Sequence, residues 1–279
     1  MISYKISNLN LINDYLALYN RCFNKFNKDF EYLNWLYAKN PMGNYIGIDA
    51  FDNNKLVGQL GGIPINFKFY NTHIKTLILL NTGIDEDYRG GRLFYNLAKN
   101  LEKTLIENDY ELLIGIGNKI ATPAWTRSIQ LRHLCQLKSF IGWCDFSKIQ
   151  SSIKEYNIFA DWNDELINWR CSNPKNKTGI LNFKNNQSVY SKTNIPFIKV
   201  YTPLLLNGVK KEHIKLDKCD VSLKVFVGLS NEINNSFLFR EIPKYLKPSP
   251  LNFLYKFLKK DYYIKQNEIY FSFLDFDIF

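Results

Sequence analysis

The residues best suited to chemistry in this sequence lie in one short segment, residues 83–94, which reads GIDEDYRGGRLF. Backbone N–H groups that converge at the start of a helix attract an anion, and the helix dipole adds to this attraction. The guanidinium groups of Arg89 and Arg92 are planar, permanently charged and well matched to phosphate oxygens. The segment therefore predicts a binding site for a phosphate-bearing cofactor.

The elements on either side of this segment would hold it in place. The apolar run at residues 76–80 predicts a strand, and leucines spaced four residues apart predict an amphipathic helix over residues 93–108. A strand, a turn rich in Gly and Arg, and a helix thus follow one another. The alternative is that Gly90 and Gly91 serve only to turn the chain before the helix.

The first half of the sequence predicts strands that come first in a group and then alternate with helices. This order is typical of an α/β (mixed α+β) fold, in which helices cover both faces of a mixed sheet. We expect strands at residues 3–6, 45–51, 56–65, 66–70, 75–82, 112–116 and 140–146, and helices at residues 9–22, 29–38, 93–108 and 122–137.

The charge of the chain favours a small anionic ligand over a nucleic acid. The formal net charge is +10, from 36 basic and 26 acidic residues among 279. The basic residues are dispersed, and the pairs at 210–211 and 259–260 are not long tracts. A nucleotide-bearing ligand suits this distribution better than a nucleic-acid groove does.

The cysteines and histidines give no pattern of metal ligands. Five cysteines lie far apart without a Cys-x-x-Cys pair, and only three histidines are present, so we expect no metal site. The sequence has neither a signal-peptide pattern at its start nor an apolar run of membrane-spanning length. We therefore expect a soluble, cytoplasmic protein that does not insert into a membrane.

A short repeat indicates that the chain contains a duplication. The dipeptide Asn-Trp at residues 34–35, followed by Asn-Pro at residues 40–41, recurs at residues 168–169 and 173–174. The repeat predicts two related units, because duplicated structural units leave internal similarity at about one domain length. We expect residues 1–150 and residues 151–279 to form them. A chance likeness of two helix ends is the alternative.

The order of elements and the Arg-Gly turn resemble the GCN5-related N-acetyltransferase (GNAT) superfamily, and the repeat resembles its tandem, two-lobed members. The resemblance covers residues 1–146. Over residues 160–279 it depends on the repeat and on a strand expected at residues 273–279. It implies a GNAT-like acyl-CoA N-acyltransferase fold, duplicated in two lobes. Acetyl-CoA would bind the first lobe as a co-substrate, and the second lobe, which lacks an Arg-Gly turn, would shape the acceptor site.

The resemblance also implies which residues hold acetyl-CoA. In the family pattern Arg/Gln-x-x-Gly-x-Gly/Ala, Arg89 matches the first position, but Arg92 stands at the first glycine. The Arg92 side chain would either crowd the pyrophosphate or contact a phosphate. A second family signature, Asn-x-x-Ala, matches at Asn118. The implied cofactor-binding residues are Thr82, Gly83, Ile84, Arg89, Gly90, Gly91, Arg92, Leu93, Phe94 and Asn118.

Trp125 stands where many family members have a tyrosine that protonates the departing thiolate. An indole N–H donates a hydrogen bond but is not an acid near neutral pH. Another group protonates the thiolate, or the thiolate leaves with the help of solvent, or the chemistry is impaired. The structural alternative for Trp125 is ordinary helix packing.

Transfer of an acetyl group to an amine needs a polarised carbonyl and a base. The resemblance implies that backbone N–H groups of residues 81–84 polarise the carbonyl oxygen, with Ile84 the first choice. Asp85 and Glu86 are the nearest acidic residues, and a solvated acidic turn is their alternative. Members of the mycobacterial enhanced-survival type use the terminal carboxylate of the chain. That comparison adds three candidates here: the carboxylate of Phe279, and Asp275 and Asp277 on the expected last strand.

The resemblance implies an N-acetyltransferase that acts on a primary amine of a small molecule. Two-lobed members suggest an amino sugar, free or nucleotide-linked, in surface polysaccharide biosynthesis. One alternative is aminoacyl transfer, as in the two-lobed peptidoglycan cross-bridge enzymes, although no heptad pattern for their coiled-coil arm is visible. The other alternative is a binding module for nucleic acid or another anionic ligand that keeps the fold without the chemistry.

Overall fold

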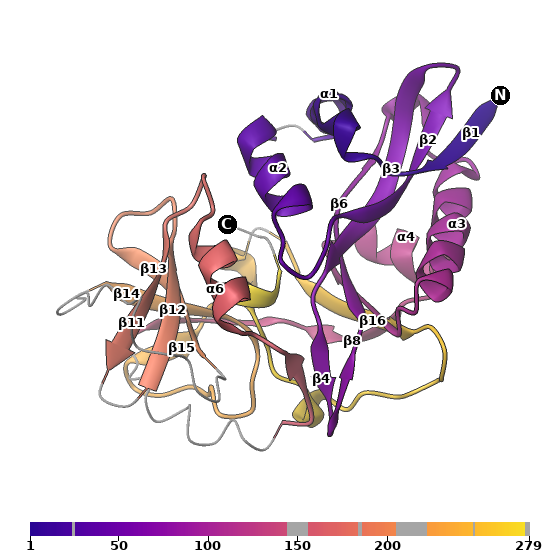
Figure 1. The fold of residues 1–279 in the computed structure, drawn as a ribbon. Helices are drawn as coiled ribbons and strands as arrows, with labels where there is room; N and C mark the ends of the chain where they lie inside the picture. The colour runs from indigo at the N-terminus through magenta and orange to yellow at the C-terminus, as the bar shows by residue number, and fades with distance from the viewer. Residues whose placement is uncertain (24–25, 144–155, 184–185, 205–221, 248, 277–279) are drawn as a thin grey trace. The chain divides into compact units, whose positions relative to one another are not determined.

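A computed structural model describes residues 1–23, 26–143, 156–183, 186–204, 222–247 and 249–276 of the chain (Figure 1). The chain divides into two compact units. Unit 1 comprises Met1–Asn66, Ile74–Cys135 and Leu251–Tyr263, and unit 2 comprises Phe67–His73, Gln136–Pro250 and Ile264–Phe279. Each unit therefore gathers segments that are distant in the sequence. The assignment of residues 1–150 and 151–279 to two related lobes stays a prediction.

Unit 1 is built on a seven-stranded mixed sheet, as the α/β prediction requires. Strands β6 and β7 are parallel, whereas β1, β2, β3 and β6 pair with one another in antiparallel order, as do β7 and β16. In spatial order the strands are β1 (Ile2–Ile6), β2 (Ile46–Asp52), β3 (Lys55–Pro64), β6 (Thr76–Ile84), β7 (Leu112–Gly117), β16 (Asn252–Phe257) and β8 (Arg132–Gln136).

Helices cover both faces of this sheet (Figure 1). One face carries α1 (Ile12–Cys22), which follows a 3-10 turn at Leu9–Leu11, and α2 (Phe30–Ala38). The other face carries α3 (Leu93–Glu107) and α4 (Ala121–Ser128). The leucines of α3, spaced four apart, are buried against the sheet, so the helix predicted at residues 93–108 is confirmed. This burial removes apolar surface from water and fixes α3 against the strands.

The helix predicted at residues 122–137 is confirmed at its start as α4, but its second half is wrong. Helix α4 ends at Ser128, Gln130 adopts the left-handed backbone with φ of 62°, and Arg132 begins strand β8. The local sequence does not show the sheet neighbour of this segment. That neighbour, β16, lies about 120 residues away in the sequence (252 minus 132) and takes the backbone hydrogen bonds of the segment. The strand predicted at residues 140–146 is observed as β9 (Lys138–Gly142), and residues 144–146 lie outside the described part.

Unit 2 contains a second large mixed sheet and a small one. In the large sheet β13 and β14 are parallel, and β9 and β17 both pair antiparallel with β14. The strands of the large sheet are β11 (Thr178–Phe183), β12 (Asn186–Lys192), β13 (Ile198–Pro203), β14 (Leu223–Leu229), β9, β15 (Phe239–Glu241) and β17 (Phe271–Ser272). The small sheet has β10 (Ile158–Ala160), β4 (Phe67–Phe69) and β5 (Thr72–Ile74). One α-helix, α6 (Asp164–Cys171), and 3-10 turns at Lys244–Leu246, Gln266–Glu268 and Phe273–Asp275 complete the described part.

The two units repeat one order of elements. In each, a helix with a buried tryptophan precedes antiparallel strands, then a parallel pair, then an antiparallel strand beyond that pair. Helix α2 carries Trp35 and helix α6 carries Trp169. The caps also correspond, because the side chains of Asp29 and Asn163 each accept a hydrogen bond from the N–H three residues ahead. Two sheet-bearing units of this kind fit the duplication that the repeat predicts.

In each large sheet, the antiparallel strand beside the second strand of the parallel pair comes from a distant part of the chain. Strand β9 follows β8 directly in sequence, yet it pairs with β14 of unit 2 from Lys138–Gly228 to Gly142–Lys224. Strand β16 follows most of unit 2, yet it pairs with β7 of unit 1 from Asn252–Gly117 to Phe257–Leu112. Neither sheet is therefore complete within one continuous stretch of chain.

The strand predicted at residues 273–279 is wrong for its first part, because Phe273–Asp275 forms a 3-10 turn. The Ser272 hydroxyl and the Asp275 carboxylate cap this turn reciprocally, which favours the turn over an extended strand. Asp275 is therefore not on a strand face. Asp277 and Phe279 lie outside the described residues.

Candidate functional site

The site begins where the parallel strands β6 and β7 part. They are paired from Thr76–Leu112 to Leu79–Gly115. Beyond these residues β6 continues to Ile84 and β7 to Gly117, and the end of β7 pairs with β16 only. The backbone of β6 after Leu79 thus faces no β7 partner. Ligands bind at the carboxyl ends of parallel strands in many α/β sheets, because backbone groups are left unpaired there.

A bulge changes the course of β6 at this point. Gly83 pairs with Gln59 and Leu80 pairs with Gly61, so Asn81 and Thr82 both lie opposite one residue of β3. Asn81 adopts the left-handed backbone with φ of 47°, which asparagine tolerates better than most residues. Such a bulge bends the strand and turns the backbone groups beyond it. The Thr82 hydroxyl is buried without a hydrogen-bond partner in the described part of the chain.

The backbone of Ile84 points away from β3. The neighbouring N–H of Asp85 donates to the carbonyl of Val57 on β3 at 3.0 Å, and backbone groups alternate between the two edges along a strand. The carbonyl of Ile84 instead accepts a hydrogen bond from Nε of Arg89 at 3.0 Å. The N–H of Ile84 is therefore directed to the edge from which β7 has parted.

The turn before α3 is open. Gly90 has φ of +80°, which a side chain would strain, and a Cβ at Gly90 or Gly91 would meet no atom within 4 Å. Arg92 forms the N-cap of α3 without a side-chain capping bond. Among the described residues, no acceptor serves the N–H groups of Leu93 and Phe94 in the first turn of this helix. Four unpaired N–H groups are normal at a helix start, and together they favour an anion.

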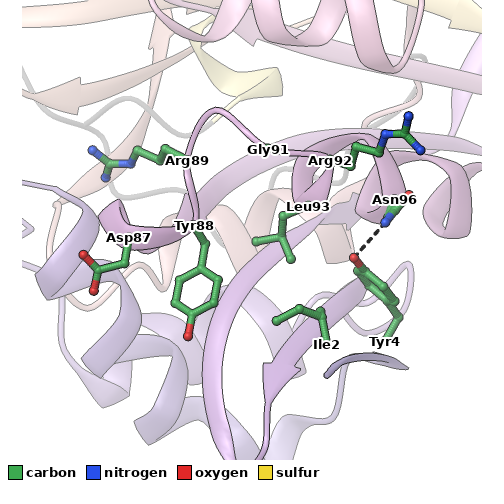
Figure 2. Close-up of a pocket in the computed structure, with 9 residues that line it drawn as sticks. All are labelled: Ile2, Tyr4, Asp87, Tyr88, Arg89, Gly91, Arg92, Leu93 and Asn96. Atoms are coloured by element: carbon green, nitrogen blue, oxygen red, sulfur yellow. Dashed lines mark hydrogen bonds between the residues drawn. The ribbon is translucent and has the colours of Figure 1, made fainter.

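The two arginines of the turn have different surroundings. Besides its bond to Ile84, Arg89 donates from Nη2 to the carbonyl of Cys22 at 3.4 Å and pairs through Nη1 with Glu86 at 3.3 Å. Arg92 has no hydrogen bond or ion pair with the described residues. Figure 2 shows the two side chains extending in opposite directions from the turn. Arg89 thus ties the turn to β6 and to the end of α1, whereas Arg92 is available to a ligand.

A pocket of about 470 Å³ lies beside the turn, within unit 1 (Figure 2). Its polar wall groups are partly used within the protein. The Tyr88 hydroxyl donates to Asp52 at 2.8 Å, and the Asn96 amide donates to the Tyr4 hydroxyl at 3.0 Å. The pocket is lined by Ile2, Tyr4, Asp87, Tyr88, Arg89, Gly91, Arg92, Leu93 and Asn96.

The acidic candidates differ in how they are held. Asp85 is buried and accepts hydrogen bonds from Arg21 Nε at 2.9 Å and Lys55 Nζ at 3.1 Å. Burial acts to raise the pKa of Asp85, but the hydrogen bonds and charges of Lys55 and Arg21 outweigh it and lower that pKa. Asp85 is consequently a weak base that anchors the turn. Glu86 is exposed and faces Arg89. Phe279 lies outside the described residues.

Asn118 and Trp125 both support helix α4. The Oδ1 atom of Asn118 accepts from the N–H groups of Ile120 and Ala121 at 2.9 and 2.8 Å, so it caps the start of this helix. Trp125 is 5% exposed and belongs to the core beneath α3. A Cβ at Gly115 would lie 2.4 Å from the Trp125 ring, so the glycine makes room for the indole. Trp125 therefore packs as the structural alternative describes.

A buried polar group that is not predicted from the sequence lies behind the bulge. Tyr19, Tyr37, Asp49, Gln59 and Asn81 form a continuous series of hydrogen bonds. The sequence signal for this group is an acid and an amide, Asp49 and Gln59, in the apolar middle parts of the strands IGIDAFD and KLVGQLGGIP. Buried polar residues of this kind need partners, and those partners come from α1 and α2.

Two negative findings apply to the described residues. No helix there combines the length and apolar character needed to cross a membrane. No group of three or more His, Cys, Asp and Glu side chains there is arranged to hold a metal ion.

A family model matches the part of the chain that contains the Arg-Gly turn. Residues 3–128 match the family model described as "Acetyltransferase (GNAT) domain". This range includes β6, the Arg-Gly turn, α3 and α4. A search of curated proteins found no relative by sequence.

Solved structures share the fold over most of the chain. A GCN5-related N-acetyltransferase from Anabaena variabilis has a TM-score of 0.62 at 11% identity, over 93% of this chain and 73% of that chain. A probable N-acyltransferase from Enterococcus faecalis has a TM-score of 0.60 at 8% identity, with the same two coverages. Eis1 from Mycobacterium abscessus has a TM-score of 0.52 at 7% identity, over 81% of this chain and 65% of that chain.

Residues 3–128 match the GNAT acetyltransferase domain model, and the chain shares its fold with a solved GCN5-related N-acetyltransferase and a probable N-acyltransferase. The mixed α/β prediction and the resemblance are thereby confirmed. Its two sheet-bearing units fit the tandem, two-lobed type of that superfamily.

Proposed function

We propose that the protein is an N-acetyltransferase that moves an acetyl group from acetyl-CoA to a primary amine. The observation that carries this proposal is the start of α3. There the open Gly90–Gly91 turn, the uncapped N–H groups and the unpaired Arg92 lie after the parallel strand that parts from β7. An anionic pyrophosphate suits this combination of backbone donors and a free guanidinium.

In this proposal the two arginines have separate tasks. Arg92 and the first-turn N–H groups of Leu93 and Phe94 bind the pyrophosphate. Arg89 holds the turn in place through Ile84, Cys22 and Glu86, so it is a positioning residue. The arginine that departs from the family pattern is then the one that contacts the phosphate.

The acyl transfer itself would take place at the backbone of β6. The N–H of Ile84 donates to the carbonyl oxygen of the acetyl group while negative charge develops there. The amine nitrogen forms a bond to the carbonyl carbon, the carbon–sulfur bond breaks, and the CoA thiolate leaves. Glu86, which is exposed, takes the ammonium proton through water. The thiolate is protonated by solvent, since Trp125 is buried and its indole is not an acid.

For the acceptor we propose a small amine with anionic groups, and a nucleotide-linked amino sugar of surface polysaccharide synthesis is the first choice. The support is the net charge of +10, which favours an anionic partner. A protein with this co-substrate would work in the cytoplasm. Residues 205–221, after β13, contain no arginine and a single glycine, so unit 2 has no counterpart of the Arg-Gly turn. In this proposal unit 2 does not bind acetyl-CoA and instead shapes the acceptor site.

A second candidate function is a binding module that keeps the fold without the chemistry. Two observations favour it: Arg92 replaces a family glycine, and the buried Trp125 replaces a family tyrosine. Such a module would bind RNA or another anionic ligand without acetyl transfer. It would show salt-dependent affinity, because phosphate contacts release counterions.

The deciding experiment measures acetyl-CoA binding by calorimetry and product formation by mass spectrometry. The acceptor panel contains nucleotide-linked amino sugars, free amino sugars and peptides. We expect binding, and one acetylated product among the amino sugars. The absence of both binding and product would exclude the enzyme, and salt-dependent RNA binding in their place would establish the module.

A further inference from the structure

A series of buried hydrogen bonds runs from a carboxylate on β2 to the bulge of β6. Asn81 Nδ2 contacts the Tyr37 hydroxyl at 3.2 Å, and the Tyr37 and Tyr19 hydroxyls are 2.8 Å apart. The Tyr19 hydroxyl bonds to Gln59 Oε1, and Gln59 Nε2 contacts Asp49 Oδ1 at 3.2 Å. Except for Asn81, which is half-buried, these side chains are fully enclosed, at 0% exposure.

The carboxylate at one end fixes the direction of every bond. Asp49 accepts hydrogen bonds from the Ser7 and Tyr15 hydroxyls as well as from Gln59, so Gln59 turns its NH₂ toward Asp49 and its oxygen toward Tyr19. The Tyr19 hydroxyl then donates its one hydrogen bond to Gln59, and the Tyr37 hydroxyl donates its own to Tyr19. The Tyr37 oxygen is left to accept, so Asn81 must present its NH₂. The orientation of the Asn81 amide is therefore set by Asp49, although Gln59 and two tyrosines lie between them.

The other end of the series holds a backbone conformation that costs free energy. Asn81 has φ of 47°, in the left-handed region, and it is one of the two residues of the bulge. A non-glycine residue stays in that region only when its surroundings hold it there. The hydrogen bond from Asn81 to Tyr37 restrains Asn81 in this conformation, because Tyr37 is itself fixed. Tyr37 is a buried residue of α2, and its ring stacks on Tyr45 with centroids 4.1 Å apart.

We propose that Asn81 and Tyr37 are positioning residues that hold the β6 bulge so that the N–H of Ile84 points at the acyl carbonyl oxygen. This inference depends on the proposed acetyl-CoA site. Ile84 lies three residues beyond Asn81, and its pairing with Gly58 is in the register that comes after the bulge. A change in the bulge would rotate the Ile84 N–H, and a donor that misses the developing charge loses most of its effect.

Tyr37→Phe tests the proposal, with Tyr15→Phe as the matched control. Both tyrosines are 0% exposed, and both belong to the hydrogen-bond group around Asp49. Tyr15 donates to Asp49 Oδ2 at 2.8 Å, outside the series that leads to Asn81. Asn81→Asp is the second variant. An aspartate tolerates the left-handed backbone but cannot donate to Tyr37.

The primary measurement is the infrared carbonyl band of bound acetyl-CoA labelled with ¹³C at the carbonyl carbon, which needs no acceptor. In the wild type, a polarising N–H lowers this frequency relative to free acetyl-CoA. We expect Tyr37→Phe and Asn81→Asp to return the band toward the free value, and Tyr15→Phe to leave it in place. With an acceptor, kcat falls about 10-fold in the first two variants and the KM for acetyl-CoA changes less than about 2-fold.

The outcomes separate the two proposals. If the wild type does not bind acetyl-CoA, the proposed function and this inference both fail. If the wild type binds and its carbonyl band is lowered, but Tyr37→Phe and Asn81→Asp keep the wild-type band, only the inference is overturned. A folded Asn81→Asp variant decides the matter if Tyr37→Phe does not fold, as judged by circular dichroism.

Discussion

Each large sheet contains one parallel strand pair, and the two pairs differ in the segment that comes after their first strand. In unit 1 the pairing of β6 with β7 ends at Leu79–Gly115, and the Arg-Gly turn and the 15-residue helix α3 come next. In unit 2 the pairing of β13 with β14 ends at Val200–Val225. The sequence after β13 has no arginine up to residue 222. The co-substrate proposal therefore applies to unit 1, where the Arg-Gly turn and α3 follow the first strand of the parallel pair.

The two parallel pairs also differ in the antiparallel strands that pair with their second strand. Strand β7 is closed by β16, whose Phe253 and Leu254 are 0% exposed. Strand β14 is closed by β9 and by the short β17, which the Asp275 carboxylate holds through the Ser272 N–H at 2.6 Å. Apolar burial secures the first arrangement, and the hydrogen bond from Ser272 to the buried carboxyl group of Asp275 contributes to the second.

The largest expected effect comes from removing β16. A chain that ends at residue 135 loses the neighbour of β7 and exposes apolar side chains that are buried in the whole protein. We expect this fragment to show no cooperative thermal unfolding by circular dichroism. The same fragment joined by a flexible linker to residues 251–263 should regain it, whereas a scrambled copy of that segment should not. Cooperative unfolding of the short fragment would contradict the role of β16.

The second prediction concerns Asp275 in unit 2. Burial raises its pKa to about 6, against the hydrogen bonds of Trp162 and Ser272 and the charge of Arg170. The unfolded value is 3.8. The folded state thus holds the proton more tightly, and the stability from this group is complete below pH 3.8 and is lost as the pH rises through about 6. The loss is about 3 kcal/mol, from a shift of about two pKa units.

Asp275→Asn tests this assignment, since an amide oxygen can still accept from Trp162 but does not ionise. Urea unfolding between pH 4 and 7 should show a free energy of unfolding that falls more steeply for the wild type than for the variant. Parallel curves would mean that Asp275 does not titrate in this range.

The third prediction contrasts two glycines of unit 1. Gly115→Ala places a Cβ 2.4 Å from the Trp125 ring, and overpacking of this kind costs about 1–3 kcal/mol. Gly91→Ala meets no atom within 4 Å and should change the free energy of unfolding by less than about 0.5 kcal/mol. Urea denaturation measures both. Equal effects would show that Trp125 does not pack on β7 as described.

The smallest effect is expected at the turn. Calorimetry should find one acetyl-CoA per chain, and Arg92→Ala should weaken its affinity about 10-fold, as expected for the loss of a hydrogen bond to a charged group. Arg240→Ala, an exposed arginine on β15 of unit 2, removes the same charge and serves as the control. Two acetyl-CoA molecules bound per chain, or an equal loss of affinity in Arg92→Ala and Arg240→Ala, would contradict a single acetyl-CoA site in unit 1.

The sequence predicted the elements on either side of the Arg-Gly turn better than it predicted the strand order of the sheet. Local patterns placed the Arg-Gly turn between β6 and α3, because strand and helix periodicities are local signals. The position of β16 between β7 and β8 could not be predicted, since pairing between residues 112–117 and 252–257 has no local signal. For the same reason residues 132–136 were assigned to a helix.

Within the site, residue types were predicted but partners were not. Arg89 matched the family pattern, yet its guanidinium is used by Ile84, Cys22 and Glu86. The tyrosines of α1 and α2 looked like ordinary aromatic core residues, and only their spatial meeting with Asp49 makes them a polar series. Hydrogen-bond partners are settled by tertiary packing, which one sequence does not display.

The crossing of β16 into unit 1 also has a consequence for synthesis on the ribosome. Strand β7 is made early, but its neighbour β16 emerges only after residues 136–250 have been translated. At about 10 residues per second, that delay is roughly 10 s. During this time the β7 edge lacks its partner β16, and an unpaired strand edge is prone to pair with other chains.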